Sequence, residues 1–196
     1  IGDDRSLLQP HMFADADFAG CALTQRSTSG LHLCVRGPHS CFHISGQSKR
    51  QSCVSHSTPE AEMVATSHAL RLIGLPALEL WSALLPHGGW MWFLEDNQAM
   101  LQRIRTGRKP TMRHLARTHR VSVSWIHEQY KAKHFLFAHE SGEKMPPDIF
   151  TKMFSDKNKW NKARLLINMV SPSELKSVVP VHLDIHSGIL EKTAMP

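Results

Sequence analysis

The sequence predicts an α/β protein in which helices cover the faces of a mixed β-sheet. The N-terminal part contains three segments of strand character separated by turn residues, a pattern typical of an antiparallel meander. The remaining chain alternates helical segments with two short apolar strands, and strands that are connected through helices usually lie parallel. At 196 residues, the chain has the length of one domain with additional terminal segments.

The first three strands follow from local alternation and turn signals. Residues 11–18 (HMFADADF) alternate along the chain, which places Asp15 and Asp17 on the same face of a strand. Residues 30–36 and 41–45 are the next two predicted strands, with a Gly-Pro pair as the turn between them.

The middle of the chain is predicted to form helix, strand and helix. We expect the first helix to begin near Thr58 as its cap, with Pro59 at the first helical position, and to kink near Gly74. Residues 90–95 (WMWFLE) form a nearly continuous apolar run, which indicates a buried strand. A helix over residues 96–105 follows.

The last part contains three further elements. Residues 111–130 are predicted to be helical with a break, and residues 135–138 to form a short strand. A helix is expected from residue 148 towards 169, with a break near residue 155. We therefore expect a linker end at residues 1–9, a folded domain at 10–170 and a poorly ordered tail at 171–196.

The charge of the chain favours a polyanionic partner. The formal net charge is +6, from 23 Lys and Arg against 17 Asp and Glu. Basic side chains that neutralise phosphates release condensed counterions, so such an excess is common in proteins that bind nucleic acid.

Cysteines and histidines provide weaker signals. None of the four cysteines forms a C-x-x-C pair, and the chain has no signal peptide and no apolar run near the roughly 18 residues of a membrane span. We expect reduced thiols in an intracellular protein, in a cytoplasmic particle or the nucleus. The 14 histidines include no set with the tight paired spacing of a structural zinc site, so we interpret them as scattered surface residues.

Four acidic residues lie near predicted strand ends and helix starts: Asp15, Glu62, Asp96 and Asp148. Taken singly, Asp15 could be an exposed strand residue, Asp96 a helix cap and Asp148 a complement to a helix dipole. Glu62 begins a stripe of small residues on its helix, where an unpaired buried charge would cost several kcal/mol. A carboxylate cluster there requires cations, which points to hard metals, chiefly magnesium.

Seven short segments in order carry a resemblance to a known family: FADADFAGC, RSTSG, GQSKRQ, STPEAEMVA, EDNQAM, RTHRVSVSW and PDIFTK. Over roughly residues 10–155, the chain resembles the ribonuclease H domain at the end of copia-type retrotransposon polyproteins. The resemblance implies a five-stranded mixed sheet of order 3-2-1-4-5. It also implies an endonuclease that cuts the RNA strand of RNA–DNA hybrids, with an upstream reverse transcriptase region of the same polyprotein as partner.

The same resemblance implies roles for individual residues. Asp15, Glu62, Asp96 and Asp148 would be the catalytic, metal-binding acids, although alternation along the strand does not decide between Asp15 and Asp17. His139 precedes the last acid, where relatives often carry a histidine that assists product release; an ordinary loop histidine is the alternative.

The expected mechanism is two-metal hydrolysis, in which the acids hold two Mg²⁺ ions, or Mn²⁺ as a substitute, roughly 3.5–4 Å apart. The 2′-hydroxyl groups in the minor groove would identify the RNA strand. The candidate phosphate contacts are Lys49, Arg50, Arg103, Arg105, Arg108 and Lys109.

The chain also departs from the family pattern. Pro59 is inserted before the Glu-Ala-Glu segment, Pro147 replaces an alanine, and Glu95 stands where relatives often have Cys. An alternative interpretation is therefore a catalytically decayed, nucleic-acid-binding remnant of the same fold. A different nuclease of the superfamily, such as an integrase, is disfavoured because its Glu comes last, whereas Glu62 is the second acid.

Overall fold

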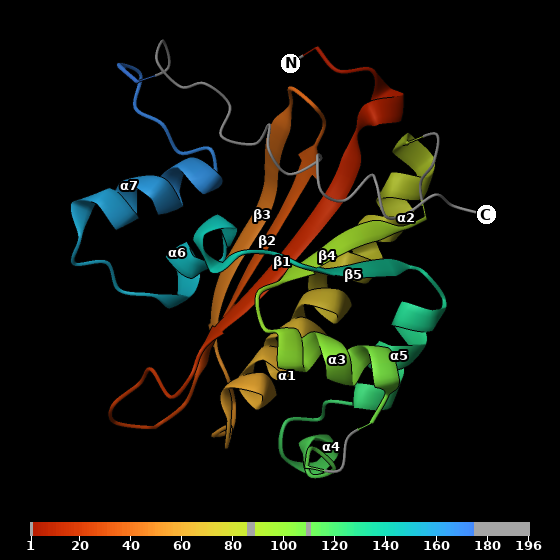
Figure 1. The fold of residues 1–196 in the computed structure, drawn as a ribbon, viewed down its shortest axis with the longest axis vertical. Coiled ribbons are helices and arrows are strands. Elements are labelled where there is room, and N and C mark those ends of the chain that lie inside the picture. The colour runs from red at the N-terminus through yellow and green to blue at the C-terminus, as the bar shows by residue number, and fades with distance from the viewer. Residues whose placement is uncertain (1, 86–88, 109–110, 175–196) are drawn as a thin grey trace.

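A computed structural model describes residues 2–85, 89–108 and 111–174, which form a five-stranded sheet with helices on both faces (Figure 1). The strands are β1 (Gln9–Asp17), β2 (Thr28–Arg36), β3 (Cys41–Arg50), β4 (Met91–Glu95) and β5 (Phe135–His139). The helices are α1 (Thr58–Ala69), α2 (Leu75–Leu84), α3 (Gln98–Thr106), α4 (Leu115–Thr118), α5 (Val123–Lys131), α6 (Asp148–Thr151) and α7 (Lys157–Leu166). Short 3-10 turns lie at Arg5–Leu7 and Gly142–Lys144, and a π-helical turn at Leu70–Gly74 joins α1 to α2.

The strand order is β3-β2-β1-β4-β5, which confirms the predicted topology. Strand β1 pairs antiparallel with β2, and β2 pairs antiparallel with β3. Strands β1, β4 and β5 are parallel neighbours, so their carboxyl ends meet at one edge of the sheet. The β1–β4 register joins Phe13 to Leu94, and its continuation brings Asp15 level with Asp96.

The two faces of the sheet carry separate apolar cores. The larger core contains Met12 and Ala14 of β1 and extends into α1, α2, α3 and α5. The smaller core contains Phe13, Cys34, Leu94 and Met145, and α6 and α7 lie on this side of the sheet (Figure 1). The alternation predicted for β1 is therefore confirmed, because residues 12 and 13 belong to opposite cores.

Strand β3 is longer than the predicted strand over residues 41–45. Its last residues are polar or basic and mostly exposed, so they lack the apolar alternation that marks a strand in the sequence. They nevertheless form the ladder with β2, in which Thr28 is paired with Arg50. Pairing with a neighbouring strand therefore defines this end of β3.

Two expectations about helix ends are wrong. Ser57 occupies the N-cap position of α1, and Thr58 is already the first helical residue. The N-cap of α3 is Asn97, whose side chain accepts a hydrogen bond of 3.0 Å from the backbone N–H of Met100. Asp96 therefore does not cap this helix, and the capping alternative for Asp96 does not hold.

The kink expected near Gly74 is a π-helical turn. A Cβ atom added to Gly74 would lie 2.9 Å from Cε1 of Phe135, so glycine lets the helix pack closely on β5. The predicted breaks in the later helical segments are confirmed, since α4 and α5 are separate and so are α6 and α7.

The predicted tail begins at residue 171, and only its first four residues belong to the described part of the chain. In this short segment Glu174 forms an ion pair with Arg164, and its Oε2 accepts a 2.9 Å hydrogen bond from the backbone N–H of Ser171. Residues 175–196 lie outside the described residues. Among the helices that the structure describes, none has the length and apolarity that crossing a membrane requires.

Candidate active site

Three of the four predicted acids meet at the carboxyl edge of the parallel strands. Asp15 comes from β1, Glu62 from α1, and Asp96 from the loop after β4. One carboxylate oxygen of each lies within 4.8 Å of the other two. Asp15 and Glu62 are each 3% exposed, and Asp96 is half-buried, so the cluster opens to solvent on the side of Asp96.

The fourth acid, Asp148, begins α6 beside this group. Its Oδ1 lies 2.6 Å from Nζ of Lys152 one turn later. In the same turn, the hydroxyl of Thr151 donates a hydrogen bond to Oδ2 of Asp15. Helix α6 is thus tied to β1 at the site, although Asp148 is outside the group of three that lies within 4.8 Å.

Glycine residues in the sheet allow α6 to approach. A Cβ atom at Gly30 in β2 would lie 2.6 Å from Cγ2 of Thr151 and 2.7 Å from the carbonyl oxygen of Pro147. A Cβ atom at Gly46 in β3 would collide with the ring of Phe150. Gly30 is paired with Asp15 in the β1–β2 ladder, so the surface that receives α6 lies next to the first acid.

The pKa values show that these carboxyl groups are crowded and poorly solvated. Burial, together with Asp15 and Asp96, raises the pKa of Glu62 to about 9. Burial also raises the pKa of Asp148 to about 6, and it raises the pKa of Asp15. Lys152 counteracts part of this effect, since its charge lowers the pKa of all three of these acids.

The donor set fits hard divalent cations. All four side chains offer carboxylate oxygens, the ligands that Mg²⁺ prefers in proteins. Oε2 of Glu62 is buried and accepts no hydrogen bond from any described residue, so it lacks the partner that a buried carboxylate oxygen requires. A cation bound between these oxygens would supply that partner and relieve the repulsion.

The structure distinguishes between the two aspartates of the DAD segment. Asp15 belongs to the cluster with Glu62 and Asp96. Asp17 lies at the end of the β1–β2 hairpin, where its Oδ1 accepts a hydrogen bond from the backbone N–H of Thr28. Asp15 is therefore the candidate ligand, and Asp17 stabilises the paired strands.

Comparison with solved structures identifies the fold. The chain superposes on an RNase H1 that was isolated from compost by a metagenomic approach, with a TM-score of 0.51 and 12% sequence identity. The match covers 73% of this chain and 92% of that chain. The chain has the ribonuclease H fold. The RNase H1 of the halophilic archaeon Halobacterium salinarum NRC-1 gives a TM-score of 0.46 at 12% identity, covering 73% and 94% of the two chains.

Sequence comparisons cover less of the chain. No family model matches it. Over 79 residues it is 39% identical to an uncharacterized mitochondrial protein of Arabidopsis thaliana, which corresponds to 40% of this chain. The chain spans only 28% of the length of that relative.

Within this ribonuclease H fold, His139 is the last residue of β5 and is exposed. It is paired with Glu95 across the β4–β5 ladder and lines a shallow pocket with Gln98 and Arg105 of α3. His139 is not a member of the group formed by Asp15, Glu62 and Asp96, whose carboxylate oxygens lie within 4.8 Å of one another. The structure therefore does not place His139 in contact with these acids.

The predicted phosphate contacts lie on two parts of the ribonuclease H fold. Lys49 and Arg50 are exposed at the end of β3. Arg103 is half-buried and Arg105 is exposed in the last turns of α3, and Arg108 follows that helix. The remaining candidate, Lys109, lies outside the described residues.

Two residues of this site were not assigned a role from the sequence. Lys152 is the last residue of the PDIFTK segment, and its ammonium group is the positive charge nearest Asp148. Glu95 is completely buried next to Asp96, and burial, Glu62 and Asp96 raise its pKa well above its ordinary value. The sequence signal for Glu95 was its departure from the family's Cys, which marks the position without indicating a function.

Proposed function

We propose that the chain is a metal-dependent endonuclease that cleaves the RNA strand of RNA–DNA hybrids during retrotransposon reverse transcription. The observation that carries this proposal is the meeting of Asp15, Glu62 and Asp96 within 4.8 Å, with Asp148 beside them, on a ribonuclease H fold. The retrotransposon origin rests on the order of the seven sequence segments that resemble copia-type domains.

The acids would bind Mg²⁺, with Mn²⁺ as a substitute. When bound, such ions activate water and stabilise the leaving oxygen of a phosphodiester. Asp15 and Glu62 supply ligands from the rigid sheet and α1, whereas Asp96 and Asp148 supply them from a loop and a short helix. Before cations bind, Lys152 keeps Asp148 oriented through the 2.6 Å ion pair.

The basic residues would hold the nucleic acid backbone. A groove between β3, α1 and the segment after α4 contains Lys49, Arg50, Arg71 and Arg120 among its lining residues. Four positive side chains along one groove suit a phosphate backbone, because each neutralised phosphate releases counterions. Arg71 and Arg120 were not among the contacts proposed from the sequence; Arg71 also stacks 4.0 Å above the ring of Trp125.

An RNA–DNA hybrid and an upstream reverse transcriptase region of the same polyprotein are the proposed partners. An A-form hybrid presents 2′-hydroxyl groups in a wide minor groove, which distinguishes the RNA strand from DNA. The reverse transcriptase region would produce such hybrids and deliver them to this domain.

The test is cleavage of a hybrid whose RNA and DNA strands carry different 5′ labels, with Mg²⁺, with Mn²⁺ and with chelator. We expect RNA fragments with either metal and none with chelator, and no cutting of the DNA strand. The Asp15→Asn variant should bind the hybrid without cleaving it, and both proteins should lose affinity steeply as salt rises. If the wild-type protein binds the hybrid but does not cleave it with either metal, the decayed remnant is the correct interpretation.

A further inference from the structure

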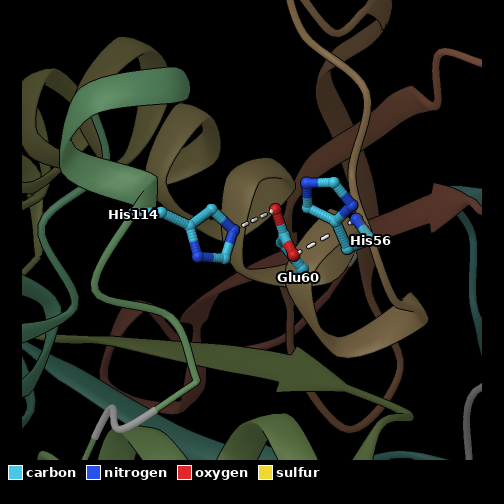
Figure 2. Close-up of side chains that lie close together, drawn as sticks. All are labelled: His56, Glu60 and His114. Atoms are coloured by element: carbon cyan, nitrogen blue, oxygen red, sulfur yellow. Dashed lines mark hydrogen bonds and ion pairs between the residues drawn. The ribbon is translucent and has the colours of Figure 1, made fainter.

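A second cluster of ionisable side chains lies apart from the four acids and is formed by His56, Glu60 and His114. One ligand atom of each lies within 4.8 Å of the other two, and Figure 2 shows both imidazole rings beside the Glu60 carboxylate. Nε2 of His114 lies 3.0 Å from Oε1 of Glu60. The backbone N–H of His56 donates a 3.2 Å hydrogen bond to Oε2, so both carboxylate oxygens are held in place.

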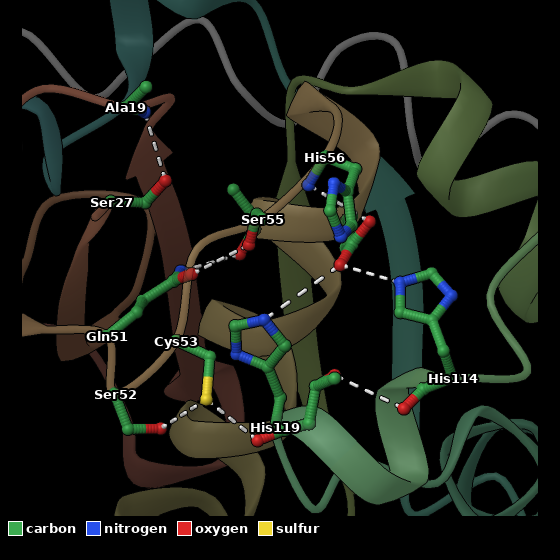
Figure 3. Close-up of polar contacts among 12 residues, drawn as sticks. Ala19, Ser27, Gln51, Ser52, Cys53, Ser55, His56, His114 and His119 are labelled. Atoms are coloured by element: carbon green, nitrogen blue, oxygen red, sulfur yellow. Dashed lines mark hydrogen bonds and ion pairs between the residues drawn. The ribbon is translucent and has the colours of Figure 1, made fainter. Parts of the chain in front are cut away.

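A fourth side chain, His119, is directed at the same carboxylate (Figure 3). Its Nε2 lies 3.8 Å from Oε1 of Glu60, which is too long for a hydrogen bond. The side chain is only 1% exposed, and Nε2 forms no hydrogen bond with any described residue. A buried imidazole nitrogen without a hydrogen bond is costly, and a cation bound between His119 and Glu60 would satisfy it, although His119 itself is outside the group of three whose ligand atoms lie within 4.8 Å of one another.

These four residues connect two segments that are distant in the sequence. His56 and Glu60 lie just before and within the first turn of α1, while His114 and His119 flank the single turn of α4. Each pair is closely spaced in the sequence, but the two pairs are more than fifty residues apart, and for this reason the sequence alone did not reveal the cluster. Glu60 and Glu62 are two positions apart on α1 and therefore lie roughly 200 degrees apart around the helix, so this cluster is separate from the acids.

The donor chemistry differs from that of the acids. Three imidazole groups and one carboxylate are ligands typical of Zn²⁺, whereas Mg²⁺ prefers oxygen ligands alone. The ring of His56 packs edge-on against that of His114, with centroids 5.5 Å apart, but a hydrogen bond between His114 and Glu60 would by itself give no role to the buried Nε2 of His119.

We propose that His56, Glu60, His114 and His119 bind one Zn²⁺ ion, which fastens α4 to the start of α1. The ion would hold the basic segment that includes Arg117 and Arg120 against the helix that carries Glu62. It would act as a structural metal, since four protein ligands leave no open position for a substrate.

The test begins with the full chain freed of metal by dialysis against chelator, followed by calorimetric titration with Zn²⁺. We expect one equivalent to bind, and His56→Gln and His114→Gln each to weaken binding by at least about tenfold, a loss typical even of residues that only orient metal ligands. The matched control is His134→Gln, because His134 is exposed and its Nδ1 lies 3.3 Å from Oε1 of Gln129, outside the cluster. This control and Glu62→Gln should both retain the wild-type zinc affinity.

Two further measurements distinguish the loss of a zinc ligand from misfolding of a variant. The melting temperature in chelator should be similar for wild type and the histidine variants, and only the wild type should gain stability on addition of Zn²⁺. Zn²⁺ should also slow tryptic cutting at Arg117, whereas an equal concentration of Mg²⁺ should not. The proposal is overturned if wild type binds no zinc, if the His56→Gln/His114→Gln double variant binds it equally well, or if Glu62→Gln abolishes binding.

Discussion

The substitution Glu62→Gln tests directly whether the acids repel one another when no metal is bound. The pKa of Glu62 is about 9 in the folded protein, against 4.5 in an unfolded chain. Between these two values the folded state binds more protons than the unfolded state, so the free energy of unfolding falls as the pH rises through this window. From pH 4.5 to pH 7, at 1.36 kcal/mol per pH unit, Glu62 lowers the stability of the metal-free protein by about 3 kcal/mol.

Glutamine keeps the size of the side chain and has no charge to desolvate, so the variant should lack this penalty. We would measure urea unfolding in chelator by circular dichroism at pH 4.5, 7 and 9. The variant should match wild type at pH 4.5, exceed it by about 3 kcal/mol at pH 7, and exceed it further at pH 9.

Addition of Mg²⁺ at pH 7 should stabilise wild type more than the variant, because only wild type offers the Glu62 carboxylate to the ion. Glu79→Gln is the control, since Glu79 is exposed on α2 and its replacement should leave the pH dependence unchanged. A difference between Glu62→Gln and wild type that stays constant from pH 4.5 to 9 would refute the proposed repulsion.

Three further substitutions test the rest of the site. Asp96→Asn should lower hybrid cleavage by orders of magnitude yet leave urea stability in chelator equal or higher, because Asn97 caps α3; retained cleavage would remove Asp96 from the catalytic set. Gly30→Ala should weaken Mg²⁺ binding in calorimetry, since its Cβ would lie 2.6 Å from Thr151 and displace α6; unchanged affinity would show that α6 adapts. Lys152→Gln should lower metal-free stability and raise Mg²⁺ affinity, because the ammonium group that neutralises the acids is removed; an affinity that falls would contradict this competition.

Local patterns predicted most of the fold because they report burial. Alternation along β1 and the apolar run of β4 correspond to strands whose side chains face the cores, and the sheet order followed from the family resemblance. The second half of β3 was missed because its exposed polar residues owe their conformation to hydrogen bonds with β2. The position of a helix end depends on a single capping side chain, which the sequence pattern does not identify. Asp96 was therefore considered as the cap of α3, whereas the structure has Asn97 at the N-cap.

The candidate site was predictable where a residue lies inside a recognisable segment. Asp15, Glu62 and Asp96 meet as expected, whereas the selection of Asp15 over Asp17 required the observed contacts. The i,i+4 spacing of Asp148 and Lys152 is visible within the PDIFTK segment, whereas the histidine cluster around Glu60 depends on tertiary proximity alone. No spacing within one segment indicates such proximity.

The position of α6 also has a consequence for synthesis of the protein. The first three acids lie within the first 96 residues, but Asp148 and the Thr151 hydroxyl that contacts Asp15 come from a segment more than fifty residues later. Contacts over such sequence distances form late, because loop closure must come first. A nascent chain that has emerged only through Asp96 would therefore hold three of the four acids. Its full cation-binding capacity would appear after residues 147–152 have left the ribosome and packed on Gly30.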